Sequence, residues 1–312
     1  MPKATREAFG DALLELGAKN PAVVALDADL SKSTMTLAFA KKYPERHVEL
    51  GIAEQNMVGV GAGLALSGKI PFITSFACFL VGRLEPLRVA AAYNKTNLKI
   101  VGTHAGLGIG DDGASQMGLE DVAAMRALPG VVVLQPADEL EAKQAVLWAA
   151  EHDGPVYLRL TRQKLADVHK PGYQFQMGRC DRVWAPEPEP KHYQATIFAS
   201  GGTVGEAVKA AQDLYARKFN AQVVNAATLN PFDEEAVRQA AAVSERLVTV
   251  EDHNVNGGLG SAVCEAAAAA GAGVPVVRLG ARSFGESGTA QELYDKHGLS
   301  APHIVEACLR NL

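Results

Sequence analysis

The sequence predicts an α/β protein of two domains, each a mainly parallel sheet flanked by helices. Short apolar runs alternate with longer helix-like stretches along the first half, which is the rhythm of βα units around a parallel sheet. The segment Pro171–His192 interrupts this rhythm with alternating proline and glutamate, and a second alternation follows it. We therefore expect a first domain at residues 1–175, a linker at 176–191 and a second domain at 192–312.

In the first domain, apolar runs predict the strands and longer stretches between them predict the helices. Asp138 precedes one such stretch, and Glu139 and Glu141 suit the positive end of a helix dipole. The expected strands are Val23–Leu26, His47–Leu50, Ile70–Thr74, Leu98–Gly102, Val131–Leu134 and Pro155–Leu160. The expected helices are Arg6–Leu16, Gln55–Leu66, Val81–Tyr93, Asp121–Ala127 and Glu139–Ala150.

The second domain repeats the alternation on a smaller scale. The expected strands are Ala195–Ala199, Gln222–Asn225, Leu247–Glu251 and Val274–Arg278. The expected helices are Gly205–Tyr215, Asp233–Ala242, Gly260–Ala270 and a closing helix at His303–Leu312.

Composition and charge argue against several classes of protein. A hydrophobic share of 48% with 21% charged residues is typical of a soluble globular chain. A net charge of −5 does not suit a nucleic-acid platform, which needs a basic surface to meet phosphates. No run approaches the ~18 apolar residues that span a bilayer, and no secretory signal is evident. The four cysteines lie far apart without a CxxC pair, so we expect a cytoplasmic protein with no metal site of its own.

Ionisable and aromatic side chains follow the expected strands of the first domain. In open parallel sheets, ligands bind outside the carboxyl ends of the strands, so these residues are expected at one rim. A purely structural domain would place turn formers there. The residues are Asp27, Asp29, Ser33, Glu54, Ser75, Phe76, Phe79, His104 and Arg162.

The stretch Glu49–Met57 is the most informative part of this rim. Glu54 lies at a strand-to-helix turn and precedes the Gly- and Ala-rich run Gly59–Ala65. Small residues let a helix lie close to the sheet, which would draw Glu54 inward. The alternative is a carboxylate that simply meets the positive end of a helix dipole.

This stretch resembles the pyrimidine-binding domain of transketolases and 1-deoxyxylulose-phosphate synthases, whose pattern is G-I-x-E-(H/Q). The resemblance covers nearly the whole chain and implies the C-terminal half of a transketolase, supplied as a separate subunit of a split enzyme. That enzyme would transfer a two-carbon ketol unit from a ketose phosphate to an aldose. The matching segments are Ala28–Leu30, Gly51–Gln55, Thr103–His104, Gly110–Gly113, Leu128–Pro129, Pro136–Asp138, Thr161–Gln163, Val250–His253 and Gly257–Ala262.

The resemblance implies catalysis with thiamine diphosphate, which reacts as a C2 carbanion. Glu54 would hydrogen-bond the ring nitrogen N1′ and favour the imino form, whose nitrogen removes the C2 proton. Phe76 and Phe79 would stack on the pyrimidine, although core packing is their alternative. Asp29 would lie near the thiamine, with an Asx turn as its alternative.

The resemblance also implies a substrate site. His104 would be a catalytic residue at the substrate, and Asp112 would hydrogen-bond a donor hydroxyl. Arg6, Ser33 and Arg162 would hold a substrate phosphate, a task that suits an arginine fork.

Two positions depart from the family pattern. Ala114-Ser115-Gln116 replaces Pro-Thr-His, so Gln116 takes the place of a histidine that contacts sugar, and Gly82 replaces a third aromatic. Both departures affect the substrate pocket more than Glu54.

The chain shows no Gly-Asp-Gly motif for the diphosphate and its Mg²⁺ or Ca²⁺. The resemblance therefore implies a partner N-terminal subunit that carries this site, in a heterotetramer. Three alternatives stay open: half of a 1-deoxyxylulose-phosphate synthase, the β subunit of a 2-oxoacid dehydrogenase, and a catalytically silent scaffold.

Overall fold

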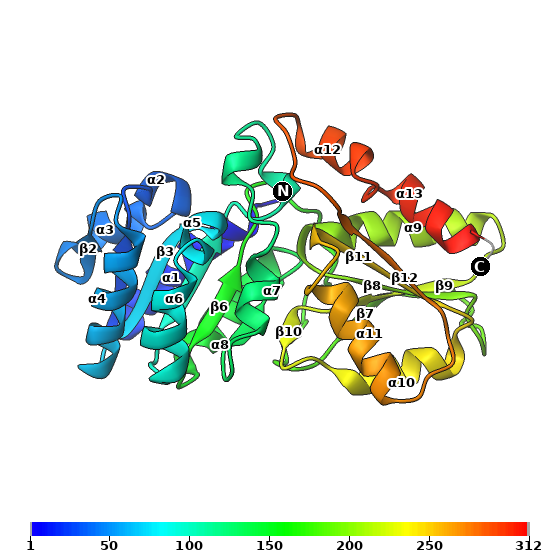
Figure 1. Cartoon of the computed structure of the whole chain (residues 1–312), viewed down its shortest axis with the longest axis horizontal. Helices are drawn as coiled ribbons and strands as arrows, with labels where there is room; N and C mark the ends of the chain where they lie inside the picture. The colour runs from blue at the N-terminus through cyan, green and yellow to red at the C-terminus, as the bar shows by residue number, and fades with distance from the viewer. Residues whose placement is uncertain (1, 311–312) are drawn as a thin grey trace.

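The computed structural model describes residues 2–310, in which two β-sheets lie side by side with helices on their faces (Figure 1). The first sheet has the order β10-β5-β6-β4-β3-β1-β2, and every neighbouring pair is parallel except β10 with β5. Its strands are β1 (Val23–Asp27), β2 (His47–Glu49), β3 (Ile70–Phe76), β4 (Lys99–Thr103), β5 (Val132–Leu134), β6 (Val156–Arg159) and β10 (Thr228–Asn230).

Helices cover both faces of this sheet, because alternate residues of its strands point to opposite sides. Phe72 of β3 belongs to the core formed with the first and eighth helices, whereas Ile73 packs with the fourth. The helices are α1 (Thr5–Lys19), α2 (Ser31–Thr34), α3 (Leu37–Lys42), α4 (Glu54–Leu66), α5 (Ala77–Val81), α6 (Leu84–Pro86), α7 (Asp121–Arg126) and α8 (Glu139–Glu151). A π-helical segment (Leu87–Tyr93) and 3₁₀ turns at Pro44–Arg46, Leu107–Ile109 and Ala114–Gln116 complete this half.

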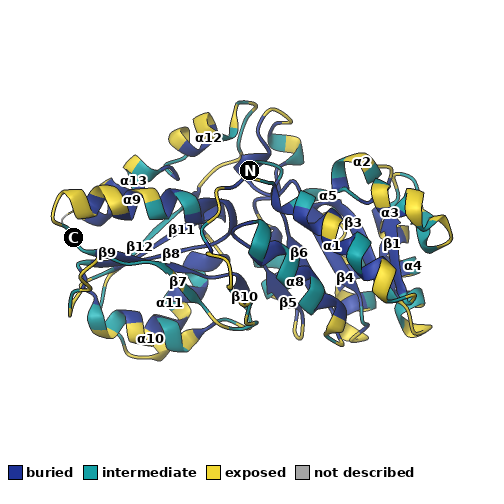
Figure 2. Cartoon of the chain, turned by 180° about the vertical axis from the view of Figure 1, so that it is seen from behind, coloured by how far each residue is buried: buried dark blue, intermediate teal, exposed yellow. Residues whose placement is uncertain are grey.

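The second sheet has the order β12-β11-β8-β9-β7, with β7 antiparallel to β9 and the other pairs parallel. Its strands are β7 (Asp181–Trp184), β8 (Ala195–Ala199), β9 (Ala221–Asn225), β11 (Leu247–Asn254) and β12 (Val276–Ala281). The helices are α9 (Val204–Ala216), α10 (Glu234–Val243), α11 (Leu259–Ala269), α12 (Ala290–Lys296) and α13 (Ala301–Leu309). Two mainly parallel sheets flanked by helices confirm the predicted fold class, and Figure 2 shows both sheets buried beneath helices whose outer faces are exposed.

Some predicted elements differ from the observed ones. The helix expected at Val81–Tyr93 is divided into α5, α6 and the π-helical segment. Gly82 follows the end of α5, and Pro86, which has no backbone N–H to donate, lies at the junction of the other two. The closing helix is α13, and its predicted last residue, Leu312, lies outside the described residues. Strand β7 lies within the segment expected to be a linker. The domain boundaries at 175 and 191 stay predictions.

The two halves of the chain share more than a connection. Strand β10 follows the second-half strand β9 in sequence, yet it pairs with β5 at the edge of the first sheet. Glu141 of α8 accepts hydrogen bonds from the Asn225 amide of β9 at 2.9 and 3.0 Å. His169 Nε2 lies 3.4 Å from the carboxylate of Asp181 at the start of β7.

None of the helices described within residues 2–310 combines the length and apolar character needed to cross a membrane.

Candidate active site

The carboxyl ends of the central strands of the first sheet bring the predicted site residues together. Glu54 begins α4, Phe76 ends β3, His104 follows β4 and Arg162 follows β6. Because β3, β4 and β6 are consecutive parallel neighbours, these side chains emerge at the same edge of the sheet.

Glu54 is a buried carboxylate, with 5% of its surface exposed. Its Oε1 accepts a hydrogen bond of 3.2 Å from the hydroxyl of Ser75, which is fully buried near the end of β3. The glycine-rich helix lies close to the sheet as expected, since a Cβ placed on Gly61 would lie 2.6 Å from Ile73 Cγ2. Glu54 is thus both at the positive end of α4 and drawn inward onto the sheet.

A group of stacked aromatic rings begins at the residue after Ser75. The rings of Phe76 and Phe79 are stacked, with centroids 5.4 Å apart and planes within 8° of parallel. Phe76 also stacks on His104, with centroids 3.8 Å apart. An exposed ring face of this stack, such as that of the half-buried Phe79, can pack against another planar ring.

His104 is held on both ring nitrogens. Its Nε2 lies 3.1 Å from Nη1 of Arg6, and its Nδ1 lies 2.9 Å from the hydroxyl of Thr103. Because a guanidinium only donates, Nε2 accepts, and we assign the proton of the neutral ring to Nδ1. Burial, reinforced by the charges of Arg6 and Arg162, lowers the pKa of His104 to about 3, so the imidazole is neutral at physiological pH.

Two arginines form a cationic side to the site. Arg6 Nη1 donates to the carbonyl of Ser33 at 2.6 Å, and Arg162 donates to the carbonyl of Ile109 at 2.7 Å. Burial lowers the pKa of Arg6 and the nearby charge of Arg162 lowers it further, while the carboxylate of Asp112 acts in the opposite sense. Among residues 2–310, the buried Nε of Arg6 has no hydrogen-bond partner. Guanidinium groups of this kind can bind an oxyanion.

The remaining predicted residues are more exposed than Glu54 and His104. Asp29 is exposed with a left-handed φ of 62°, and its backbone N–H donates to Glu49. The side-chain-to-backbone turn at this strand end is made by Asp27, whose carboxylate accepts from the N–H of Leu30. Asp112 and Gly82 are exposed, and Gln116 is half-buried in a 3₁₀ turn.

Sequence reasoning named two groups of residues without giving them a role. Ser75 and Thr103 were visible at strand ends, but their hydroxyl contacts to Glu54 and His104 depend on strand register. Asp252 lies in the second half of the chain and still contacts the loop after β4. Only its position in Val250–His253, near a strand's carboxyl end, indicated it.

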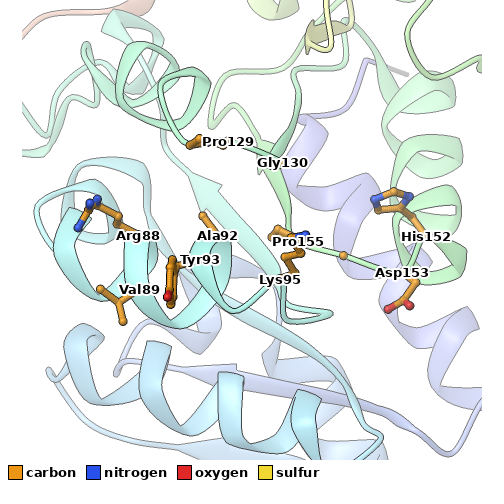
Figure 3. A pocket seen from close by; sticks show the side chains of 11 residues that line it. Arg88, Val89, Ala92, Tyr93, Lys95, Pro129, Gly130, His152, Asp153 and Pro155 are labelled. Carbon is orange, nitrogen blue, oxygen red and sulfur yellow. The ribbon is translucent and has the colours of Figure 1, made fainter.

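A cavity of about 820 Å³ lies elsewhere (Figure 3). Its walls come from the π-helical segment and from residues that precede β4, β5 and β6, including Lys95, Gly130 and Pro155. It therefore opens at the amino ends of these strands, opposite the candidate site. Within residues 2–310, no three His, Cys, Asp or Glu side chains are grouped to hold a metal ion.

A buried glutamate and stacked aromatic rings at the carboxyl ends of parallel strands make this rim a candidate ligand site in an α/β protein of two sheets. The chain matches the family model of the transketolase pyrimidine-binding domain over residues 1–167 and that of the transketolase C-terminal domain over residues 187–304. The chain belongs to the transketolase family and spans these two domains.

Its relatives include both half-length and full-length proteins. It is 41% identical to a putative transketolase C-terminal section of Methanocaldococcus jannaschii, over 99% of this chain and 96% of that protein. It is 38% identical to a 6-deoxy-6-sulfo-D-fructose transketolase subunit of a Clostridium species, over 97% of this chain and 92% of that protein. The transketolase of Mus musculus is 37% identical over 97% of this chain, which spans only 48% of the mouse protein.

Solved structures agree with this assignment. A split gene transketolase, described as an inactive β4 tetramer, superposes with a TM-score of 0.88 at 44% identity, covering 99% of this chain and 97% of that one. The transketolase of Campylobacter jejuni superposes with a TM-score of 0.83 at 25% identity, covering 98% of this chain and 46% of the longer one.

Proposed function

We propose that this chain is the C-terminal subunit of a split, cytoplasmic transketolase, which transfers a two-carbon ketol unit from a ketose phosphate to an aldose with thiamine diphosphate as cofactor. The observation that carries the proposal is the buried Glu54 carboxylate, hydrogen-bonded to Ser75 beside the stacked rings of Phe76 and Phe79.

These residues fit the pyrimidine end of the cofactor. A buried carboxylate binds a ring N–H strongly, because few water molecules compete for it, and the aromatic surface matches a planar ring in shape. When bound, thiamine diphosphate supplies a nucleophilic carbon that carries the two-carbon unit.

The protein groups divide the remaining work. Glu54 would hold a proton toward ring atom N1′ of the bound cofactor, with its carboxylate oriented by Ser75. His104, kept neutral with its proton on Nδ1, accepts a hydrogen bond from a sugar hydroxyl at Nε2 once the substrate displaces Arg6. Arg6 and Arg162 hold the distal oxyanion, with Ser33 beside them, and Asp112 and Gln116 line the path to it. Asp29 is assigned to the cofactor side.

The diphosphate and its Mg²⁺ or Ca²⁺ are assigned to a separate N-terminal subunit. Supporting this division, the chain spans about half of the mouse transketolase and nearly all of the Methanocaldococcus C-terminal section. The active assembly is proposed to be a heterotetramer of two such pairs, and the related split gene transketolase, described as an inactive β4 tetramer, shows that a chain of this kind can associate with copies of itself.

The partner is proposed to cover the outer side of α4 and the π-helical segment. Five large apolar side chains are exposed there and immediately beside it, where a solvated face would carry polar groups. They are Ile52, Leu66, Leu84, Val89 and Tyr93.

Glu54→Gln tests the proposal. The amide keeps the size of the side chain but cannot share a proton with N1′ in the same way. Loss of one preorganised interaction of this kind typically lowers the rate by roughly 10²–10³-fold, about 2.7–4 kcal/mol. The measurement is exchange of the cofactor C2 proton with deuterium in the complex with the partner subunit.

The control is Glu45→Gln, which changes an exposed carboxylate of the same half and is expected to leave exchange unchanged. Folding of Glu54→Gln is checked by thermal unfolding. Wild-type exchange in a folded Glu54→Gln complex would show that another group activates the cofactor.

A further inference from the structure

A carboxylate from the second half of the chain reaches into the candidate site of the first. Asp252 lies on β11 with 2% of its surface exposed. Its two oxygens accept the backbone N–H of Leu107 at 2.6 Å and of Gly108 at 3.0 Å, 145 and 144 residues away in sequence. These amides belong to the loop that starts at His104 and continues to Asp112.

The loop backbone lies directly against this carboxylate. Gly106 adopts a φ of +79°, and a Cβ at that position would collide with the carboxylate of Asp252. A Cβ on Gly108 would likewise collide with the amide of Gln163. Glycine at position 106 therefore lets the loop approach Asp252 closely enough to donate both hydrogen bonds, and glycine at position 108 leaves room for Gln163.

The same carboxylate is also connected to the segment Thr161–Gln163, which contains Arg162. Oδ2 of Asp252 also accepts from the hydroxyl of Tyr294 at 2.9 Å, and that hydroxyl accepts from the Gln163 amide at 2.7 Å. Arg162 in turn donates to Ile109 in the loop. One buried oxygen pair thus ties together two segments that reach the sugar side of the site.

We propose that Asp252 is a positioning residue for ketol transfer, which fixes the loop bearing His104 and Asp112 relative to Arg162. This assignment rests on the proposed function. Asp252 contacts neither cofactor nor substrate, and it acts through backbone amides whose position sets where the sugar-contacting side chains lie.

The preceding residue provides a matched comparison. Glu251 is equally buried on the same strand, and its carboxylate also accepts two backbone N–H groups, from Leu259 and Gly260 at 2.7 and 2.8 Å. Those amides begin α11, within the second half. Glu251→Gln and Asp252→Asn therefore remove the same kind of interaction, but only the second loosens the site.

Hydrogen exchange measured by mass spectrometry on the full chain is the first readout. Asp252→Asn puts an NH₂ group where an acceptor stood, so peptides covering residues 103–116 should exchange faster, whereas Glu251→Gln should speed exchange only near residues 257–262. Tyr294→Phe removes one hydrogen bond from the same carboxylate and should have an intermediate effect. It takes the place of Asp252→Asn as the test variant if Asp252→Asn does not fold.

Kinetics of the complex with the partner subunit are the second readout. A displacement of about 1 Å in a reacting group can cost on the order of 10²-fold, so Asp252→Asn should lower kcat/KM for a ketose phosphate by roughly 10- to 100-fold. C2 proton exchange of the cofactor, which depends on Glu54, should stay near the wild-type rate. Glu251→Gln should keep kcat/KM near wild type after correction for the folded fraction.

The outcomes separate the two hypotheses. Faster loop exchange with unchanged kcat/KM, or equal losses of kcat/KM in both variants, would overturn the positioning role while leaving the proposed function intact. Absence of ketol transfer and of C2 exchange in the wild-type complex would overturn the proposed function and, with it, this assignment.

Discussion

At the scale of single residues, a line of hydrogen bonds runs through the candidate site. Arg6 donates to His104, His104 to the Thr103 hydroxyl, and that hydroxyl to the carbonyl of Ser75, 3.3 Å away. The Ser75 side chain then donates to Glu54. The proposed anion side and the proposed cofactor side are therefore connected by hydrogen-bonded polar groups, so a change in one contact affects the orientation of the next.

Arg162 is expected to anchor the distal anion of the substrate. A charge-assisted contact is worth about 1.5–3 kcal/mol, so Arg162→Ala should lower kcat/KM for a phosphorylated ketose by roughly 10- to 150-fold. An uncharged analogue of the same sugar should lose far less. Because Arg162 also donates to Ile109, a modest shared loss is expected, and the ratio between the two substrates is the quantity to measure. Equal losses would make Arg162 a purely structural residue.

Most of the residues at this rim could be predicted from the sequence, but the residues that hold them in position could not. Glu54, Phe76 and His104 each follow a strand, and the rule for open parallel sheets places such residues together without any knowledge of side-chain packing. Asp252 and Tyr294 could not be found in this way. Their contacts depend on how the second sheet docks against the first, and no local pattern encodes a separation of 145 residues.

At the scale of elements, the outer side of α4 contains glycines where a solvated helix would carry polar residues. Gly59 and Gly63 are exposed, and a Cβ at either position would meet open space. Glycine in a helix interior lowers helix stability by about 0.8–1.0 kcal/mol relative to alanine. Two such glycines on an exposed side therefore indicate a surface that another molecule approaches closely.

The double variant Gly59→Ala/Gly63→Ala separates these effects. The free energy of unfolding of the chain alone should rise by roughly 1–2 kcal/mol, because two helix-destabilising residues are replaced. The dissociation constant for the partner subunit should rise at least several-fold, because the two methyl groups hold the facing surface away. Gly205→Ala on α9, another helical position with open space, is the control for assembly. Unchanged partner affinity would place the interface elsewhere.

Most strands were predictable because they are buried apolar runs. The ten predicted strands all occur, and all except β2 and β12 are mainly buried, as a two-sided parallel sheet requires. Strands β7 and β10 escaped prediction because each is a short antiparallel edge strand of three or four residues, with partly exposed positions. Their pairing is decided by the neighbouring strand and not by their own sequence.

At the scale of the whole molecule, the chain is expected to be inactive alone. It contributes the pyrimidine side of the site, so rigorously purified chain should bind thiamine diphosphate weakly and should transfer no ketol unit. Adding an N-terminal transketolase subunit that carries the Gly-Asp-Gly motif should restore both properties. The measurements are cofactor binding by calorimetry and ketol transfer in a coupled assay. Steady turnover by the chain alone would contradict the division of labour proposed here.

Strand β10 has a consequence for how this polypeptide can be divided. It lies in the second half of the chain and covers the open edge of β5 in the first sheet. An uncovered edge strand presents unpaired N–H and C=O groups that recruit strands from other molecules. A fragment ending near residue 175 would expose the Val132–Leu134 edge and is expected to aggregate, although it contains Glu54 and both phenylalanines. Dividing this chain near residue 175 would therefore disturb its fold more than separating the chain from a partner subunit.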